Sequence, residues 1–285
     1  MKKETVVQIT LMALALAILA GCRDEQEKKA DQAALVSVSL NNLVMVKGGE
    51  FLMGDFGPLI GEKLPFNVDK DTPLHRVILS DFRIGKYRVT WGEFNRWLDL
   101  QGREENDYYR WTMDHKDPDF QSDKVYMGNN YPATVSWQDA RSYCQWLGQV
   151  SNRYMDLPTE AQWEYAARSR GQFRIYGNST DRWYYEDDPS INFTIYHAPV
   201  GSYPPNPLGL YDMMGNGSDW IKDWYAKNYY TVSPEKDPQG PAQGEKKVIR
   251  TGEHGTGIYT IVRSSQRPDN KWGSEFRCVE NSPLK

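Results

Sequence analysis

One stretch of this chain says more about its fold than any other: Leu157-Pro-Thr-Glu-Ala-Gln-Trp-Glu-Tyr-Ala-Ala-Arg168. Thr159 is a residue type favoured at the N-cap of a helix, because its hydroxyl can accept a hydrogen bond from an N–H of the first turn. Gln162 follows close behind it. We therefore predict a helix from Glu160 to Arg168.

Similar signals upstream predict two more helices. Thr90 precedes residues 91–98 and has Glu93 at the capping-box position. Ser136 is the predicted cap of another helix, which begins directly after it, and Asp139 follows three residues later. One stripe of this second helix is formed by Ala140, Tyr143, Cys144 and Leu147.

Strand signals are few. Residues 42–54 predict two short strands around a Gly-Gly turn, and alternation over residues 75–84 predicts one more. Much of the remainder is rich in Gly, Pro, Asn, Asp and Tyr, so something other than helices and sheets must pin it, such as a disulfide or a metal ion. The predicted class is an α+β fold, a single domain with low regular secondary structure.

The composition argues against a nucleic-acid partner and leaves the role of the aromatic residues open. The 285 residues include 39% hydrophobic and 25% charged residues, which is a globular balance. The net charge of -4 gives no electrostatic footprint for nucleic acid, so we predict no nucleic-acid partner. Aromatic residues reach 13%, which indicates either core packing or an exposed aromatic binding surface.

The first residues predict export and a lipid anchor. A basic start at Lys2 and Lys3 precedes an apolar run over residues 6–20, which is too short for a comfortable membrane span and is typical of a signal peptide. The run ends in Leu-Ala-Gly-Cys22, which is similar to a bacterial lipobox. An ordinary secretory signal with a coincidental cysteine is the alternative.

We accordingly divide the chain into three parts. Residues 1–21 are predicted to be the signal peptide, with Cys22 lipidated after cleavage. Residues 22–38 are charged and predict a solvated, lipid-anchored tether, and residues 39–285 form the domain. Since arginine rather than aspartate follows Cys22, we expect an outer-membrane lipoprotein that faces the periplasm.

Several stretches, in order along the chain, together resemble the formylglycine-generating enzyme (sulfatase-modifying factor) family. The resemblance covers nearly the whole mature chain and implies a compact fold that is distantly similar to C-type lectins. The stretches are residues 45–54, 73–79, 84–90, 135–140, 157–168, 209–216 and 276–279.

The chain lacks the residues on which two activities of that family depend. The family's oxidase holds copper with two cysteines near the C-terminus, and the corresponding segment, residues 248–263, contains none. Its sulfoxide synthases need clustered histidines for iron, whereas the histidines here are isolated in the sequence. We therefore predict neither copper nor iron. The four histidines are His75, His115, His197 and His254.

Two structural features are expected to remain. Apart from Cys22 the chain has two cysteines, and the resemblance implies that Cys144 and Cys278 pair with each other; two buried free thiols are the alternative. It also implies a structural calcium site in the segment that starts at Leu210, completed by water. Its predicted ligands are the side chains of Asp212 and Asp219 and the carbonyls of Gly215 and Gly217.

A retained scaffold without the family's catalytic residues favours a non-catalytic protein that binds a protein partner. The partner would be an envelope protein, with this chain a regulator or accessory of type VI secretion, or a toxin that this chain neutralises as an immunity protein. The predicted contact residues lie in the segment that matches the family's substrate groove: Arg250, Glu253, His254, Tyr259 and Arg263.

Two other functions remain open at this stage. One is an oxidoreductase or protein-maturation factor with a relocated metal site that uses His254 or His197 with carboxylates. The other is a carbohydrate- or peptidoglycan-binding module, which the aromatic excess alone suggests.

Overall fold

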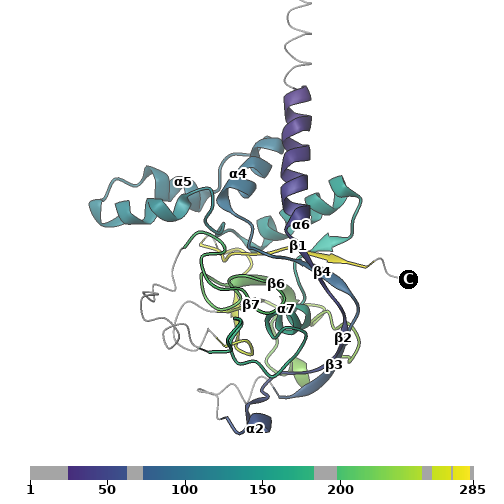
Figure 1. The fold of residues 1–285 in the computed structure, drawn as a ribbon. Helices are drawn as coiled ribbons and strands as arrows, with labels where there is room; N and C mark the ends of the chain where they lie inside the picture. Colours follow the sequence, from purple (N-terminus) through teal and green to yellow (C-terminus); the bar gives the residue numbers. More distant parts are fainter. Residues whose placement is uncertain (1–24, 63–72, 183–197, 252–258, 271, 283–285) are drawn as a thin grey trace, which may run out of the picture.

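The computed structural model describes residues 25–62, 73–182, 198–251, 259–270 and 272–282, with side chains left out for residues 118–122. Within these ranges the chain forms three small antiparallel sheets with helices packed around them (Figure 1). Most regular elements are short, so the predicted α+β class with little regular structure is confirmed.

The four-stranded sheet joins the two ends of the domain. Its order is β1 (Leu43–Val46), β4 (Phe82–Gly85), β9 (Val279–Asn281) and β5 (Met155–Asp156). Strand β9 lies near the C-terminus and pairs with both β4 and β5. The sheet is therefore complete only when the whole domain has been assembled.

The other two sheets have two and three strands. Strand β2 (Gly49–Met53) pairs with β3 (His75–Leu79). Strand β7 (Lys247–Arg250) lies between β6 (Asp219–Trp224) and β8 (Arg263–Gln266). Strand β8 is thus an edge strand, and its surroundings matter for the site described below.

The strand predictions are partly right. Strands β1 and β2 exist, but each belongs to a different sheet. The single strand predicted over residues 75–84 is wrong, because the chain turns at Ser80 and Asp81 between β3 and β4. The carboxylates of Asp81 and Asp237 accept hydrogen bonds from the backbone N–H groups of Gly48 and Ser80, at 2.9 and 2.7 Å. These carboxylates satisfy backbone N–H groups at the turn between β3 and β4. The chain can therefore leave one sheet and enter the next without losing these hydrogen bonds.

The three predicted helices are confirmed, with ends shifted by one or two residues. Thr90 and Glu93 form a capping box at the start of α4, as Thr159 and Gln162 do at the start of α7. The Ser136 hydroxyl caps α6 by accepting from the N–H of Asp139. The bounds are Trp91–Leu100 for α4, Trp137–Ser151 for α6 and Glu160–Ala167 for α7.

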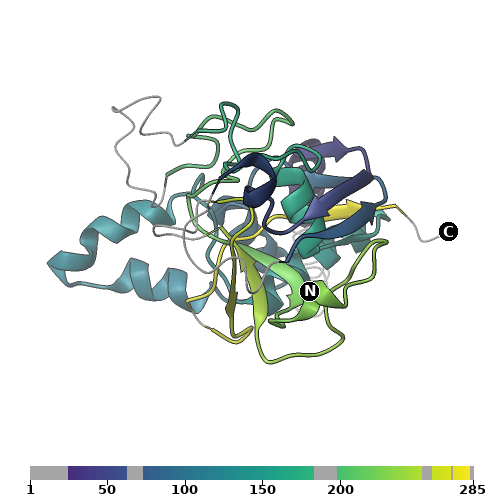
Figure 2. The ribbon, with the colours of Figure 1, turned by 90° about the horizontal axis from the view of Figure 1, so that it is seen from below.

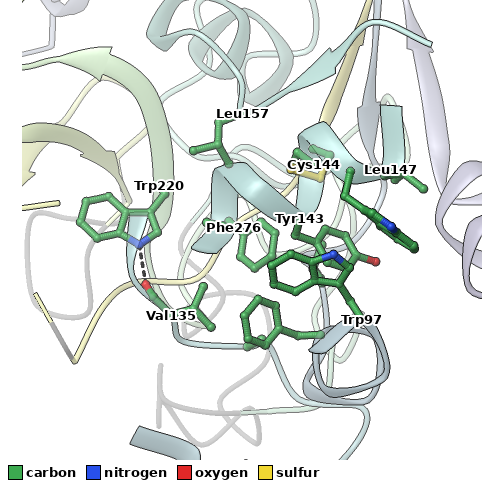
Figure 3. Close-up of a cluster of buried hydrophobic side chains, with 14 of the residues drawn as sticks. Trp97, Val135, Tyr143, Cys144, Leu147, Leu157, Trp220 and Phe276 are labelled. Atoms are coloured by element: carbon green, nitrogen blue, oxygen red, sulfur yellow. Dashed lines mark hydrogen bonds between the residues drawn. A yellow bond between two sulfur atoms is a disulfide. The ribbon is translucent and has the colours of Figure 1, made fainter. Parts of the chain in front are cut away.

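A cluster of large side chains forms one half of the core (Figure 3). The rings of Trp97 and Phe276 both pack against Tyr143 of α6, with centroids 5.7 and 5.6 Å away. The indole N–H of Trp220 donates to the carbonyl of Val135 at 2.7 Å, so this buried polar group is satisfied.

The predicted disulfide lies in this same cluster. Cys144 and Cys278 are bonded, with Cα atoms 5.4 Å apart and a sequence separation of 134. The bond joins α6 to the segment that leads into β9. On the chain-entropy model, closing a loop of this length stabilises the fold by about 5 kcal/mol.

Most side chains of the predicted tether are exposed where the structure describes them, as expected of a solvated segment, but the segment is a helix. Residues 25–41 form a helix that stands away from the domain at its N-terminal end (Figure 1). Leu35 is buried in the core, and the Ser39 hydroxyl lies 3.0 Å from the hydroxyl of Tyr143. Leu35 and Ser39 are four residues apart and share one helix face, which fixes the last turns to the domain.

An arm projects from the domain between α4 and α6 (Figures 1 and 2). It contains α5 (Asp107–Asp114) and the 3₁₀ helix η1 (Pro118–Met127). The remaining short helices are α2 (Gly57–Ile60) and η2 (Tyr229–Thr231). Within the described part of the chain, no helix combines the length and apolarity needed to cross a membrane.

Candidate functional site

The loop predicted to bind calcium is wrapped around an arginine. Asp212, Gly215, Asn216 and Gly217 all have positive φ angles, which coil the backbone tightly. The carbonyls of Gly215, Asn216 and Gly217 accept hydrogen bonds from Arg88 at 2.9, 2.6 and 3.2 Å. Arg88 reaches this loop from the segment between β4 and α4 and is itself buried.

Asp219, at the end of the loop, is enclosed by cationic and polar groups. Arg88 donates to both of its oxygens at 3.0 and 3.2 Å, and Arg277 donates at 3.2 Å. The indole N–H of Trp163 donates at 2.9 Å. Burial raises the pKa of the Asp219 carboxyl, but Arg277 and Arg88 outweigh it, so the net pKa is lowered and the carboxylate stays charged.

The residues of the predicted calcium site therefore do not fit a divalent ion in the arrangement they have. Gly215, Gly217 and Asp219 already hold a cation, the Arg88 guanidinium, and a divalent ion among the same oxygens would meet that positive charge at close range. Asp212 is buried and accepts from the N–H of Gly201 at 3.1 Å. No group of three His, Cys, Asp or Glu side chains in the described ranges is arranged to hold a metal ion.

A second buried ionic cluster lies on α7. Glu160 and Glu164 are four residues apart and face the same way. Arg250 donates to both, at 3.0 and 2.9 Å, and Arg263 donates to Glu160 at 2.7 Å. Arg168 donates to Glu164 at 2.8 Å. All five side chains are at most 2% exposed.

Two of the predicted partner contacts are corrected by this cluster. Arg250 and Arg263 cannot meet a partner at the surface, because their guanidinium groups are used inside the domain. Tyr259 is half-buried and packs on Tyr176, with ring centroids 5.4 Å apart. The other predicted contacts, Glu253 and His254, lie outside the described residues, as does the predicted lipidation site, Cys22.

The surface offers a different candidate. Two hollows of about 510 and 570 Å³ share one wall formed by Ser265 and Gln266 of β8 and by Trp272. The first continues over Lys246, Arg267, Asp269 and Asn270. The second continues over Tyr108, Thr134, Ser218, Ile249, Gly273, Ser274 and Glu275. We call the two together the Trp272 groove.

Aromatic side chains border this groove. Trp272 is 55% exposed and makes edge-on contacts with Tyr108 and Trp111 of the arm, at centroid distances of 5.4 and 5.2 Å. Trp111 is 41% exposed and also packs against His115, 4.6 Å away. The arm and the loop after β8 therefore form one aromatic wall that is open to solvent.

Glu275 fixes the floor of the groove. One of its carboxylate oxygens accepts from the Thr134 hydroxyl at 2.9 Å, and the other accepts from the backbone N–H of Ser218 at 2.6 Å. Because both oxygens are engaged, the carboxylate serves as a structural tie between three segments.

Sequence reasoning missed the groove residues, although a signal was present. Trp272 stands in Pro268-Asp-Asn-Lys-Trp-Gly273, a run of turn-forming residues. A tryptophan in such a run is expected in a surface turn, where part of its ring is exposed. The exposed aromatic surface that composition left open is present here.

Known proteins are similar to this chain in sequence and in fold. The family model described as "Sulfatase-modifying factor enzyme 1-like domain" matches residues 28–281. A formylglycine-generating enzyme of Streptomyces coelicolor is 31% identical over 297 residues, which cover 86% of this chain and 91% of that enzyme. The solved structure of PvdO from Pseudomonas aeruginosa aligns with a TM-score of 0.61 and 25% identity, covering 84% of this chain and 94% of PvdO.

A further relative is longer than this chain. The serine/threonine-protein kinase pkn1 of Chlamydia pneumoniae is 33% identical over 255 residues, which cover 85% of this chain but 38% of the kinase. The chain thus spans well under half of that relative.

Proposed function

The chain belongs to the sulfatase-modifying factor family, and we propose that it uses this scaffold as a non-catalytic, lipid-anchored periplasmic protein that holds a protein partner in the Trp272 groove. The observation that carries the proposal is the open aromatic wall beside an edge strand. The oxidase cysteines expected between residues 248 and 263 are absent from the sequence, and the two cysteines of the domain are bonded to each other.

The edge strand suggests how a partner is held. Within the described ranges, β8 receives its backbone hydrogen bonds at Ser264, Ser265 and Gln266 from β7 alone. An extended peptide satisfies the free side of such a strand by adding to the sheet, while pockets beside it select side chains. Trp272 lies where it can supply such a pocket and is the type of residue that dominates binding energy at interfaces.

The test is affinity capture from envelope extracts, with mass spectrometry and three baits. We expect one protein to be enriched on the wild-type domain and lost from Trp272→Ala. Tyr154→Ala is the matched control, because Tyr154 is an equally exposed aromatic, at 57%, that lines neither hollow. Equal recovery on all three baits, or none above a blank resin, would contradict the proposal.

Metal analysis separates this proposal from the enzymatic alternative. An oxidoreductase with a relocated site needs a redox metal, whereas the proposal needs none. Stoichiometric copper or iron in the purified protein, together with turnover of a cysteine-containing peptide, would overturn the proposal.

We further propose that this chain acts either in type VI secretion or as an immunity protein. A regulator or accessory of type VI secretion predicts kinase and phosphatase genes nearby. An immunity protein predicts a toxin gene directly adjacent. The identity of the captured protein, an envelope component or a toxin, distinguishes the two.

A further inference from the structure

Arg88 lies where the family resemblance implies a metal ion. The structure assigns it the role of a built-in cation: its guanidinium holds the loop of residues 212–219 in a shape that would otherwise need an oxygen-liganded metal. The domain therefore folds, and forms its groove, without a divalent ion. This inference stands apart from the proposed function, because it concerns the protein without its partner.

The geometry of Arg88 is that of a fully coordinated cation. All three nitrogens of the guanidinium donate hydrogen bonds, and the acceptors come from two separate segments of the chain. Besides the three loop carbonyls and both oxygens of Asp219, the Thr251 hydroxyl lies 3.3 Å from Nη2. Backbone carbonyls and a carboxylate that converge in this way are the donor set that calcium prefers.

The local charge explains why a cation is required there. Asp212, Asp219 and Glu275 are each at most 3% exposed, and all three attract Arg88 electrostatically. Buried carboxylates without a counter-charge are strongly unfavourable. Arg88 and Arg277 supply counter-charge from within the chain, through their ion pairs with Asp219.

The loop that Arg88 holds is continuous with the groove floor. The Gly217 carbonyl accepts from Arg88 and also from the Thr251 hydroxyl, at 2.8 Å. The next residue, Ser218, lines the groove and donates its N–H to Glu275. Arg88 is thus a positioning residue for the groove, although it lines neither hollow.

The experiment combines a chelator with chemical rescue, read as the thermal midpoint, Tm. We expect the wild-type Tm to be the same in EDTA and in millimolar calcium. Arg88→Ala should lower the Tm by roughly 10 °C, because it leaves buried oxygens without their cation. Millimolar ethylguanidinium should restore part of that loss, since it fits the space that the side chain leaves.

Arg88→Met is the matched control, because it fills the space without a charge. It should be destabilised but gain nothing from ethylguanidinium. A wild-type Tm that falls in EDTA and recovers with calcium would overturn the inference. Equal behaviour of the Ala and Met variants would also overturn it, since Arg88 would then act by packing alone. If Arg88→Ala does not fold, two other results test the inference. The wild-type Tm should be unchanged in EDTA, and the Tm of Arg88→Lys, which keeps the charge, should lie between those of wild type and Arg88→Met.

Discussion

The buried ionic clusters and the Trp272 groove differ in the residues that form them. Charged side chains lie in the interior, and an aromatic side chain lies at the surface. Charged residues, which sequence reasoning assigned to ligands and contacts, are inside: Arg250 and Asp219 are fully buried in matched networks. Tryptophan, for which the composition left both core packing and an exposed surface open, is more than half exposed at position 272. In this molecule the charges hold the irregular chain together, and the aromatic surface is available for recognition.

The difference has a physical basis. A domain with few helices and strands leaves many backbone carbonyls without ladder partners. Buried arginines satisfy several of them at once, as Arg88 and Arg168 do. The charge of each arginine then has to be matched by a buried carboxylate, which is why acidic residues are found in the core.

The largest effect on stability is expected from breaking the α7 cluster. Arg250→Ala leaves Glu160 and Glu164 short of a buried counter-charge and should lower the free energy of unfolding by about 3–5 kcal/mol. Arg83→Ala is the control, because its ion pair with Glu280 is partly exposed and should cost less than about 1 kcal/mol. Urea denaturation measures both. If Arg250→Ala is as stable as wild type, the arginine is not a structural residue and the comparison fails.

The disulfide should come next. Replacing Cys144 and Cys278 together by alanine removes the link between α6 and the C-terminal strand and should cost about 2–5 kcal/mol. The measurement is urea denaturation of the double variant beside oxidised wild type. Two free thiols in protein purified without a reducing agent would contradict the assigned bond.

A smaller effect is expected from pH. Burial, followed by repulsion from Glu160, raises the pKa of Asp223 to about 7 from 3.8. Between these values the folded state binds more protons than the unfolded state, so stability falls as pH rises through this window. For this group the loss between pH 6 and pH 8 is about 1.4 kcal/mol.

Asp223→Asn should remove this pH dependence, because the amide does not titrate. The free energy of unfolding of both proteins at pH 6 and pH 8 tests it. The same loss in the variant as in wild type would show that Asp223 is not the group responsible.

Local signals in the sequence predicted local structure well. The caps at Thr90, Ser136 and Thr159 predicted three helices because the cap and the first turn interact within a few residues. The disulfide and the fold followed from the family resemblance. Strand pairing was not predictable, since whether β1 meets β2 or β4 depends on contacts far apart in sequence.

The candidate site was predicted less well, for a related reason. Asp219 and Gly217 match the motif of a metal loop, but the residue that occupies the loop, Arg88, comes from more than a hundred positions upstream. Arg250 and Arg263 were predicted to lie at the surface because the sequence does not show that their acidic partner on α7, Glu160, packs against them. The Trp272 groove is formed by β8, the arm and the loop after β8, which only the fold brings together.

The smallest effect on stability, and the most informative, is expected at the groove itself. Trp272→Ala removes a ring that is more than half exposed and keeps only edge-on contacts with Tyr108 and Trp111, so the free energy of unfolding should fall by about 1 kcal/mol or less. Affinity for the captured partner should nevertheless fall by about 10- to 100-fold, because exposed tryptophans that a partner covers are frequent hot spots. Urea denaturation and titration calorimetry on the same preparation measure the two quantities. If Trp272→Ala lost stability and affinity together, the groove would be part of the core, and recognition would have to be sought on another face of the domain.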